Sequence, residues 1–166
     1  MKTLLLLRHA RPTPASPTGR DFDRPLTAEG RADALLVGRF LRHSQLTPAT
    51  VVCSPAARAR QTAEHVLDAA QLAAPVLFRD RIYEASTEQL IEVVAEAAGE
   101  SGVLLVVGHN PGLQELVQRL TGAAASMHPA TLARVDLDID AWGDLQDARE
   151  AGQLVFALPP QASAGQ

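Results

Sequence analysis

Short runs of apolar residues recur along the first two thirds of the chain, and longer stretches with a helical period lie between them. The runs cover residues 3–7, 51–53, 75–78 and 103–107. A continuous apolar run is typical of a strand that is buried on both of its faces. The pattern therefore predicts four buried strands of one sheet.

The stretches between these runs carry apolar side chains three or four positions apart, which is the period of a helix with one buried face. The clearest predicted face consists of Leu113, Leu116, Val117 and Leu120. The other predicted faces are Ala32, Leu35, Leu36 and Phe40; Ala63, Val66, Leu67 and Ala70; and Leu90, Ile91, Val94 and Ala97. Strands that alternate with helices indicate an α/β fold with a largely parallel central sheet.

The last third of the chain follows a different pattern. Residues 131–138 alternate between apolar and polar side chains with one slip, and residues 153–158 are again apolar. Because no helical period separates these two runs, they predict a hairpin-like pair at the edge of the sheet. The predicted sheet is therefore mixed, mostly parallel with an antiparallel edge strand.

The chain has 166 residues, the length of one globular domain. We assign residues 1–158 to that domain and expect residues 159–166, which are Pro, Gln, Ala, Ser and Gly, to form a flexible tail. The net charge is 15 − 19 = −4, which argues against a general nucleic-acid-binding protein. Most of the excess acid lies beyond residue 135 and is explained most simply as a solvated surface.

Three features predict a cytoplasmic protein. The single cysteine rules out an internal disulfide and fits a reducing compartment. No apolar run approaches the roughly 20 residues that a membrane helix needs. The first apolar run meets Arg8 and His9 too soon for a signal peptide.

Histidine and arginine side chains gather at the carboxyl ends of the predicted strands, where ligands bind in open α/β sheets. Arg8 and His9 follow the first strand, Arg58 lies in the first turns of the helix after the second, and His109 follows the strand at 103–107. The planar guanidinium group suits phosphate oxygens, and an imidazole can attack phosphorus to form a covalent intermediate. These residues predict a phosphate site with a histidine nucleophile.

Each of these residues also has a purely structural explanation. A histidine at a strand end is often only hydrogen-bonded framework, and Arg58 alone fits a solvated charge on its helix. Asn110 and Pro111 fit the N-cap and the first position of the following helix. The convergence of three strand ends on one side of the sheet nevertheless favours a functional site.

The motifs that carry these residues resemble those of the histidine phosphatase superfamily. They are Arg8-His9, Ser54-Pro55-x-x-Arg58-Ala59-x-Gln61-Thr62-Ala63 and Gly108-His109-Asn110-Pro111. The small size of the chain and Arg24-Pro25-Leu26-Thr27-x-x-Gly30 are similar to the SixA-type phosphohistidine phosphatase branch. The resemblance runs from about residue 2 to 122. It departs at Ala10, where the family usually has glycine, and alanine is tolerated there unless the position needs a positive φ.

The resemblance implies a three-layer α/β/α fold of the phosphoglycerate mutase-like kind. It also implies that His9 is the nucleophile and forms a phosphohistidine that water hydrolyses. Arg8, Arg58 and His109 would then hold the phosphoryl oxygens and stabilise charge in the transition state. No cofactor is implied.

Three further residues are candidates for the site. Many members of the family protonate the leaving group with a carboxylic acid, and Glu84 is the best-placed acid here. The alternative is that Glu84 is a helix-entry acid ahead of a helix over residues 88–98, with Ser86 as its N-cap. In the proline-rich, aperiodic loop 11–24, Arg20 and Arg24 are candidate phosphate ligands, and local pairing with Asp21 and Asp23 is the alternative.

Two other kinds of site fit the sequence poorly. A zinc site at His9 and His109 lacks a third ligand at a recognisable spacing, and the arginines would repel the cation, so we expect no metal. Cysteine phosphatases use a Cys-x5-Arg motif, and the position that Cys53 would require is Ala59.

We therefore expect a phosphatase whose substrate is phosphohistidine on a protein. The alternatives are a phosphomonoesterase that acts on a small phosphorylated metabolite and a non-catalytic phosphate-binding module. The short chain leaves little room for a capping insertion, which predicts an open pocket that suits a phosphorylated side chain of another protein.

Overall fold

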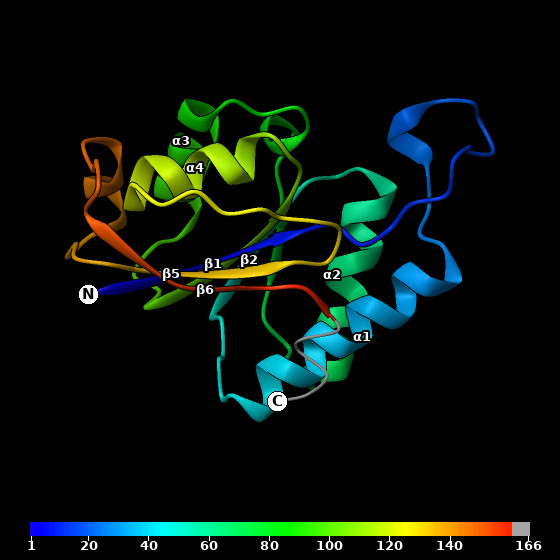
Figure 1. Ribbon diagram of the computed structural model, residues 1–166, viewed down its shortest axis with the longest axis horizontal. Helices are drawn as coiled ribbons and strands as arrows, with labels where there is room; N and C mark the ends of the chain where they lie inside the picture. The colour runs from blue at the N-terminus through cyan, green and yellow to red at the C-terminus, as the bar shows by residue number, and fades with distance from the viewer. Residues whose placement is uncertain (161–166) are drawn as a thin grey trace.

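The computed structural model describes residues 1–160 and contains a mixed sheet of six strands in the order β3-β2-β4-β1-β5-β6 (Figure 1). The strands are β1 (Lys2–Arg8), β2 (Thr50–Cys53), β3 (Val76–Phe78), β4 (Val103–Gly108), β5 (Leu132–Leu137) and β6 (Gly152–Leu158). The first four strands pair in parallel, whereas β5 pairs antiparallel with both β1 and β6. The predicted mixed sheet with an antiparallel pair at its edge is confirmed.

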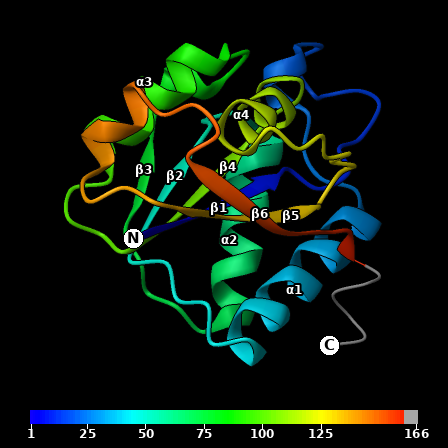
Figure 2. The same ribbon diagram turned by 60° about the vertical axis from the view of Figure 1, so that its left-hand side comes forward.

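Four α-helices cover the sheet in two layers, and short 3-10 helices lie in the connections. The helices are α1 (Ala28–His43), α2 (Ala57–Ala70), α3 (Thr87–Ala97), α4 (Gly112–Thr121), η1 (Asp21–Asp23), η2 (Asp80–Ile82) and η3 (Trp142–Gln146). Helices α1 and α2 lie together on one side of the sheet, and α3 and α4 lie on the other (Figure 2). The three-layer α/β/α architecture is confirmed.

Strand β1 is buried on both faces because it lies between these two layers. Leu4 and Leu6 join the core cluster that contains the apolar faces of α3 and α4. Leu5 and Leu7 join the cluster beneath α1 and α2. All four leucines are fully buried, which explains why the run is continuously apolar.

The buried face of α1 differs from the predicted one. Ala32 is exposed, and Leu35 and Leu36 are only half-buried. The buried residues of the helix are Gly30, Ala34, Val37, Gly38, Phe40 and Leu41. The reason is a close approach to α2, since a Cβ at Gly38 would overlap the Val66 carbonyl oxygen and lie 2.7 Å from the Ala69 Cβ. The close approach of the α1 and α2 backbones determines which face of α1 is buried. The pattern of apolar residues does not reveal this contact.

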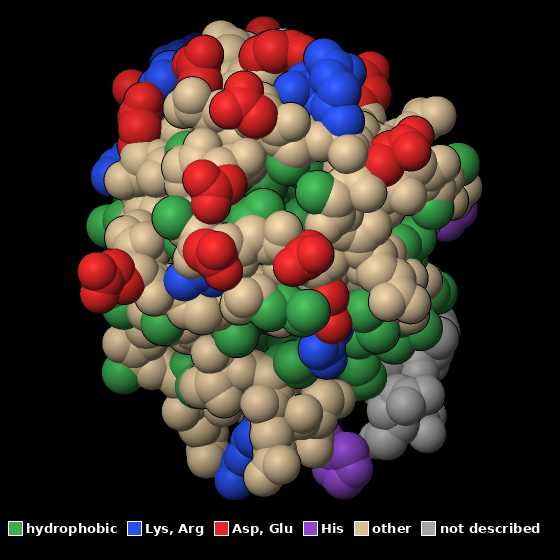
Figure 3. Space-filling view, turned by 90° about the vertical axis from the view of Figure 1, so that its left-hand side faces the viewer, with side chains coloured by type: hydrophobic (Ala, Val, Ile, Leu, Met, Phe, Trp, Pro, Cys, Tyr) green, Lys and Arg blue, Asp and Glu red, His purple; other side chains and the backbone are tan. Residues whose placement is uncertain are grey.

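Other expectations concern the helix ends, the tail and the charged surface. Ser86 caps α3 as predicted, in a capping box with Gln89. Residues 161–166 of the predicted tail lie outside the described residues. Within residues 1–160, each helix is too short or too polar to cross a membrane. Acidic side chains are prominent on the face shown in Figure 3, on the side of the molecule where β1 begins.

We predict that Gly38→Ala destabilises the fold although alanine favours helices over glycine by about 1 kcal/mol. The new methyl group would force α1 and α2 apart, so the free energy of unfolding should fall by roughly 1–3 kcal/mol in chemical denaturation. Gly143→Ala is the control, because a Cβ at Gly143 meets nothing within 4 Å. A stabilised Gly38→Ala protein would contradict the close helix contact.

Candidate active site

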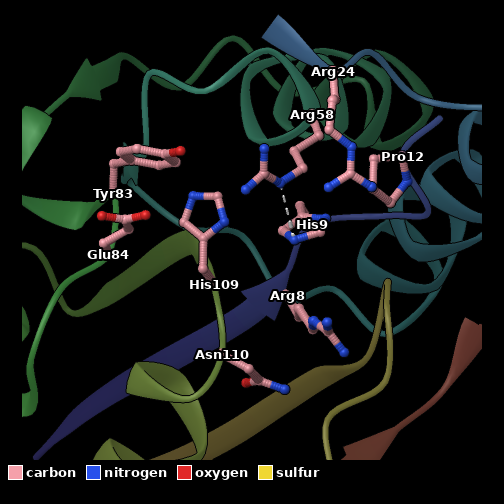
Figure 4. Close-up of a pocket in the computed structure, with 9 residues that line it drawn as sticks. All are labelled: Arg8, His9, Pro12, Arg24, Arg58, Tyr83, Glu84, His109 and Asn110. Atoms are coloured by element: carbon pink, nitrogen blue, oxygen red, sulfur yellow. Dashed lines mark hydrogen bonds between the residues drawn. The ribbon is translucent and has the colours of Figure 1, made fainter. Parts of the chain in front are cut away.

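A cavity of about 390 Å³ lies beyond the carboxyl ends of β1, β2 and β4. Nine residues line it: Arg8, His9, Pro12, Arg24, Arg58, Tyr83, Glu84, His109 and Asn110 (Figure 4). The parallel register brings Arg8 opposite Gly108, the residue before His109. The strand ends therefore bring together residues that are about 100 positions apart in the sequence.

His9 is held in one tautomer at the end of β1. Its Nδ1 lies 2.8 Å from the Ala10 carbonyl oxygen, and a carbonyl only accepts hydrogen bonds, so Nδ1 carries the proton. Nε2 is therefore unprotonated, and Arg58 Nε donates to it at 3.4 Å. Burial, together with Arg58 and Arg8, lowers the pKa of His9 to about 4 against the opposing effect of the Ala10 hydrogen bond. Near neutral pH the ring is uncharged, with its lone pair on Nε2.

Arg58 lies in the first turn of α2 and is almost completely buried. Besides contacting His9, it donates from Nη1 to the Asp21 backbone oxygen at 2.9 Å and from Nη2 to the Asp21 carboxylate at 3.0 Å. The two bonds to Asp21 fix the plane of the guanidinium group.

His109 follows β4, and its ring centroid lies 5.0 Å from that of His9. Its Nε2 is 2.7 Å from Ser54 Oγ, at the end of β2. Burial, with His9 and Arg58 adding to it, lowers the pKa of His109 to about 3. His109 is therefore a neutral hydrogen-bonding group rather than a further cation beside the arginines.

Arg8 and Asn110 both bind the segment that follows α4. Arg8 Nη1 donates to the Met127 carbonyl oxygen at 3.1 Å, and Asn110 Nδ2 donates to the same oxygen at 2.7 Å. The expectation that Asn110 caps α4 with Pro111 at its first position is wrong, because Pro111 is the N-cap and the helix begins at Gly112. The Asn110 amide binds the Met127 carbonyl instead of capping the helix.

Of the three remaining candidates, Arg24 and Glu84 line the cavity and Arg20 does not. Arg24 lines the cavity and pairs with Asp21 at 2.8 Å. Glu84 also lines it, exposed and with a φ of +57°. Arg20 is not among the lining residues. Its side chain is 71% exposed, with Nε 3.9 Å from the Asp23 carboxylate. The local pairing given as the alternative is therefore present, and a substrate-binding role for Arg20 stays a prediction.

Three residues at the site are not predicted from the sequence: Pro12 and Tyr83 line the cavity, and Asp21 contacts Arg58. Tyr83 lines the cavity with its ring edge-on to His109 at 5.5 Å. Its hydroxyl donates to the Asp21 carboxylate at 2.8 Å. Asp21 lies 62 positions from Tyr83 and 37 from Arg58. From the sequence, its neighbours Arg20 and Arg24 predict only a local ion pair. No sequence signal linked these segments.

The structure explains two features of the sequence, the alanine at position 10 and the single cysteine. Ala10 does not have a positive φ, so alanine causes no backbone strain where the family usually has glycine. Its N–H donates to Thr62 Oγ1 at 2.9 Å. Burial raises the pKa of Cys53 to about 12, which keeps this thiol protonated and unsuited to be a nucleophile.

The arrangement suits the binding and transfer of a phosphoryl group. Arg8, Arg24 and Arg58 present cationic donors to a cavity in which His9 Nε2 holds a lone pair. Among residues 1–160, no group of three or more His, Cys, Asp or Glu side chains is arranged to hold a metal ion.

Known proteins with similar sequences and structures include phosphatases. The profile of the histidine phosphatase superfamily (branch 1) matches residues 4–93. An uncharacterised protein of Mycobacterium tuberculosis is 39% identical over 106 residues, which cover 63% of this chain and 63% of that protein. The match thus spans less than two thirds of the length of this relative.

Two solved structures share the fold over nearly the whole chain. The candidate phosphohistidine phosphatase SixA of Nakamurella multipartitia is 33% identical, with a TM-score of 0.80 over 95% of this chain and 96% of that chain. A mycobacterial glucosyl-3-phosphoglycerate phosphatase is 16% identical, with a TM-score of 0.66 over 93% and 97% of the two chains.

We predict that the lowered pKa of His9 makes the fold less stable in mild acid. The unfolded histidine takes up a proton as the pH falls below about 6.5, whereas the folded one stays neutral until about pH 4. The free energy of unfolding should therefore fall by about 1–2 kcal/mol between pH 7 and pH 5 through His9 alone. Denaturation at both pH values should give a smaller loss for His9→Gln. The exposed His43→Gln should behave as the wild type, and an equal loss in all three proteins would contradict the assignment.

Proposed function

Since the chain belongs to the histidine phosphatase superfamily, we propose that it removes phosphate from phosphohistidine on another protein. The observation that carries the catalytic part of this proposal is the neutral His9 ring, whose Nε2 lone pair lies beside Arg58 in a cavity lined by further arginines.

The reaction proceeds in two steps. His9 Nε2 attacks phosphorus, the bond between phosphorus and the leaving nitrogen breaks, and the leaving imidazole takes up a proton. Water then attacks the phosphohistidine at His9, which releases phosphate and restores the neutral ring. Arg8, Arg58 and His109 bind the phosphoryl oxygens in both steps, and Arg24 adds positive charge at the mouth of the cavity.

Glu84 is the proposed donor of the proton to the leaving group. It lines the cavity from the turn before α3 and is exposed there, where a carboxyl group can exchange protons with water. An imidazole leaves more readily than an alkoxide, so a phosphohistidine substrate needs less help from Glu84 than a phosphate ester does.

Access to the cavity and one relative support this substrate class. The exposed side chain of Glu84 in the cavity wall indicates a mouth open to solvent, which admits a phosphorylated side chain of another protein. The SixA candidate at 33% identity supports the same substrate class. A small phosphorylated metabolite is the second candidate, because a cavity of about 390 Å³ falls in the size range of small-molecule sites.

The proposed reaction needs no metal ion. Cationic Arg8 and Arg58 flank the two histidines and would repel a metal there, and they supply the charge stabilisation that a metal would otherwise provide. The single cysteine, buried at the end of β2, fits a reducing compartment, and we place the reaction in the cytoplasm.

The substrate is tested by comparing kcat/KM for a phosphohistidine protein with kcat/KM for a panel of phosphorylated metabolites, in the presence of a metal chelator. We expect the protein substrate to be preferred. A preference of about 100-fold or more for a metabolite, equivalent to ~2.7 kcal/mol in transition-state binding, would contradict the proposal.

The controls of this comparison are two histidine variants. His9→Ala should lower kcat/KM by about 1000-fold or more on every substrate, because no nucleophile remains. His43→Ala removes an exposed histidine at the end of α1 and should keep the wild-type rate.

A further inference from the structure

Asp21 joins three separate segments of the chain at the rim of the cavity. Its carboxylate accepts hydrogen bonds from Arg24 at 2.8 Å, from Arg58 at 3.0 Å and from the Tyr83 hydroxyl at 2.8 Å. The three donors lie at the end of the 11–24 loop, on α2 and after η2. All three line the cavity (Figure 4), although Asp21 itself does not.

The contact with Arg58 fixes the direction in which that guanidinium group acts. Asp21 takes up Nη1 through its backbone oxygen and Nη2 through its carboxylate. Because all five N–H groups of arginine lie in one plane, two bonds on one edge determine where the Nε–H points. That group points to His9 Nε2, the atom that would carry the phosphoryl group.

We propose that Asp21 is a positioning residue for the phosphoryl transfer, acting through Arg58 and Tyr83. This inference rests on the proposed phosphatase activity. Asp21 holds the Arg58 guanidinium beside His9 Nε2, so that its charge is in place when charge develops on the phosphoryl oxygens. It also ties Tyr83 to Arg58 and thereby sets the wall of the cavity next to His109.

The same carboxylate opposes the binding of the substrate. It is half exposed and stays ionised, because hydrogen bonds from Arg24 and Tyr83 hold its pKa well below the usual range. A negative charge this close to the cavity repels an incoming phosphate. Loss of the carboxylate should lower kcat, because Arg58 is no longer positioned. It should not raise KM, because the repulsion of the phosphate is lost as well.

The test uses Asp21→Asn, which keeps the size of the side chain and removes its charge. We expect kcat for an aryl phosphate to fall about 10- to 100-fold, with KM unchanged or lower. Asp23→Asn is the matched control, because Asp23 lies on the same 3-10 helix but contacts Arg20 and Thr18 instead. This control should stay within about twofold of the wild type.

A combined variant separates positioning from a general effect of charge. If Asp21 acts through Arg58 and Tyr83, then adding Asp21→Asn to a protein that carries Arg58→Ala and Tyr83→Phe should lower the remaining kcat by less than about twofold. A full 10- to 100-fold further loss, or an equal loss in Asp23→Asn, would overturn the proposal.

A spectroscopic measurement keeps this test independent of turnover. The Nε–H proton of Arg58, assigned by its absence in Arg58→Lys, should give a resolved NMR signal that shifts in Asp21→Asn and is unchanged in Asp23→Asn. An unchanged signal in Asp21→Asn would overturn the positioning role. If the wild type hydrolysed no phosphorylated compound, the proposed function would fail, and this signal would still decide whether Asp21 orients Arg58.

Discussion

The hydrogen bond from His9 Nδ1 to the Ala10 carbonyl oxygen determines which nitrogen of the ring is free to react. It places the proton on Nδ1 and the lone pair on Nε2, which faces Arg58. This hydrogen bond is held in place because the backbone around His9 and Ala10 is fixed by its neighbours. Strand β1 is buried between both helical layers, the Ala10 N–H binds Thr62, and the Ala130 N–H binds the backbone oxygens of Arg8 and His9. The core of the fold thus leaves the lone pair on Nε2, the atom that we propose attacks phosphorus.

The second constraint is the concentration of positive charge in one cavity. Arg8, Arg24 and Arg58 line the same space, and like charges at such close range destabilise one another. Burial keeps His9 and His109 neutral, so neither adds to the repulsion, and Asp21 neutralises part of it at the rim. A net charge of −4 conceals this local excess, because acidic side chains are prominent on the side where β1 begins (Figure 3).

The sequence predicted the features that depend on local pattern. The apolar run of β1 and the face of α4 were visible because burial there follows a regular period, and Arg8, His9, Arg58 and His109 were found because each lies next to a strand end or helix start. Features that depend on close contact between backbones, or on partners far apart in the sequence, could not be predicted from the sequence. Gly38 sets the rotation of α1 by its lack of a side chain. Asp21 contacts residues 37 and 62 positions away, and Asn110 Nδ2 donates to the Met127 carbonyl as well as to Gln114 of α4.

The nucleophilic role of His9 is the central claim, and trapping the phosphorylated enzyme tests it most directly. Rapid quenching of the reaction in base, followed by peptide mapping and ³¹P NMR, should find one acid-labile phosphoramidate on Nε2 of His9, with His109 unmodified. Phosphate found on His109 or on Nδ1 of His9 would contradict the assignment. A rapid turnover with no phosphorylated histidine at any time would contradict the covalent mechanism itself.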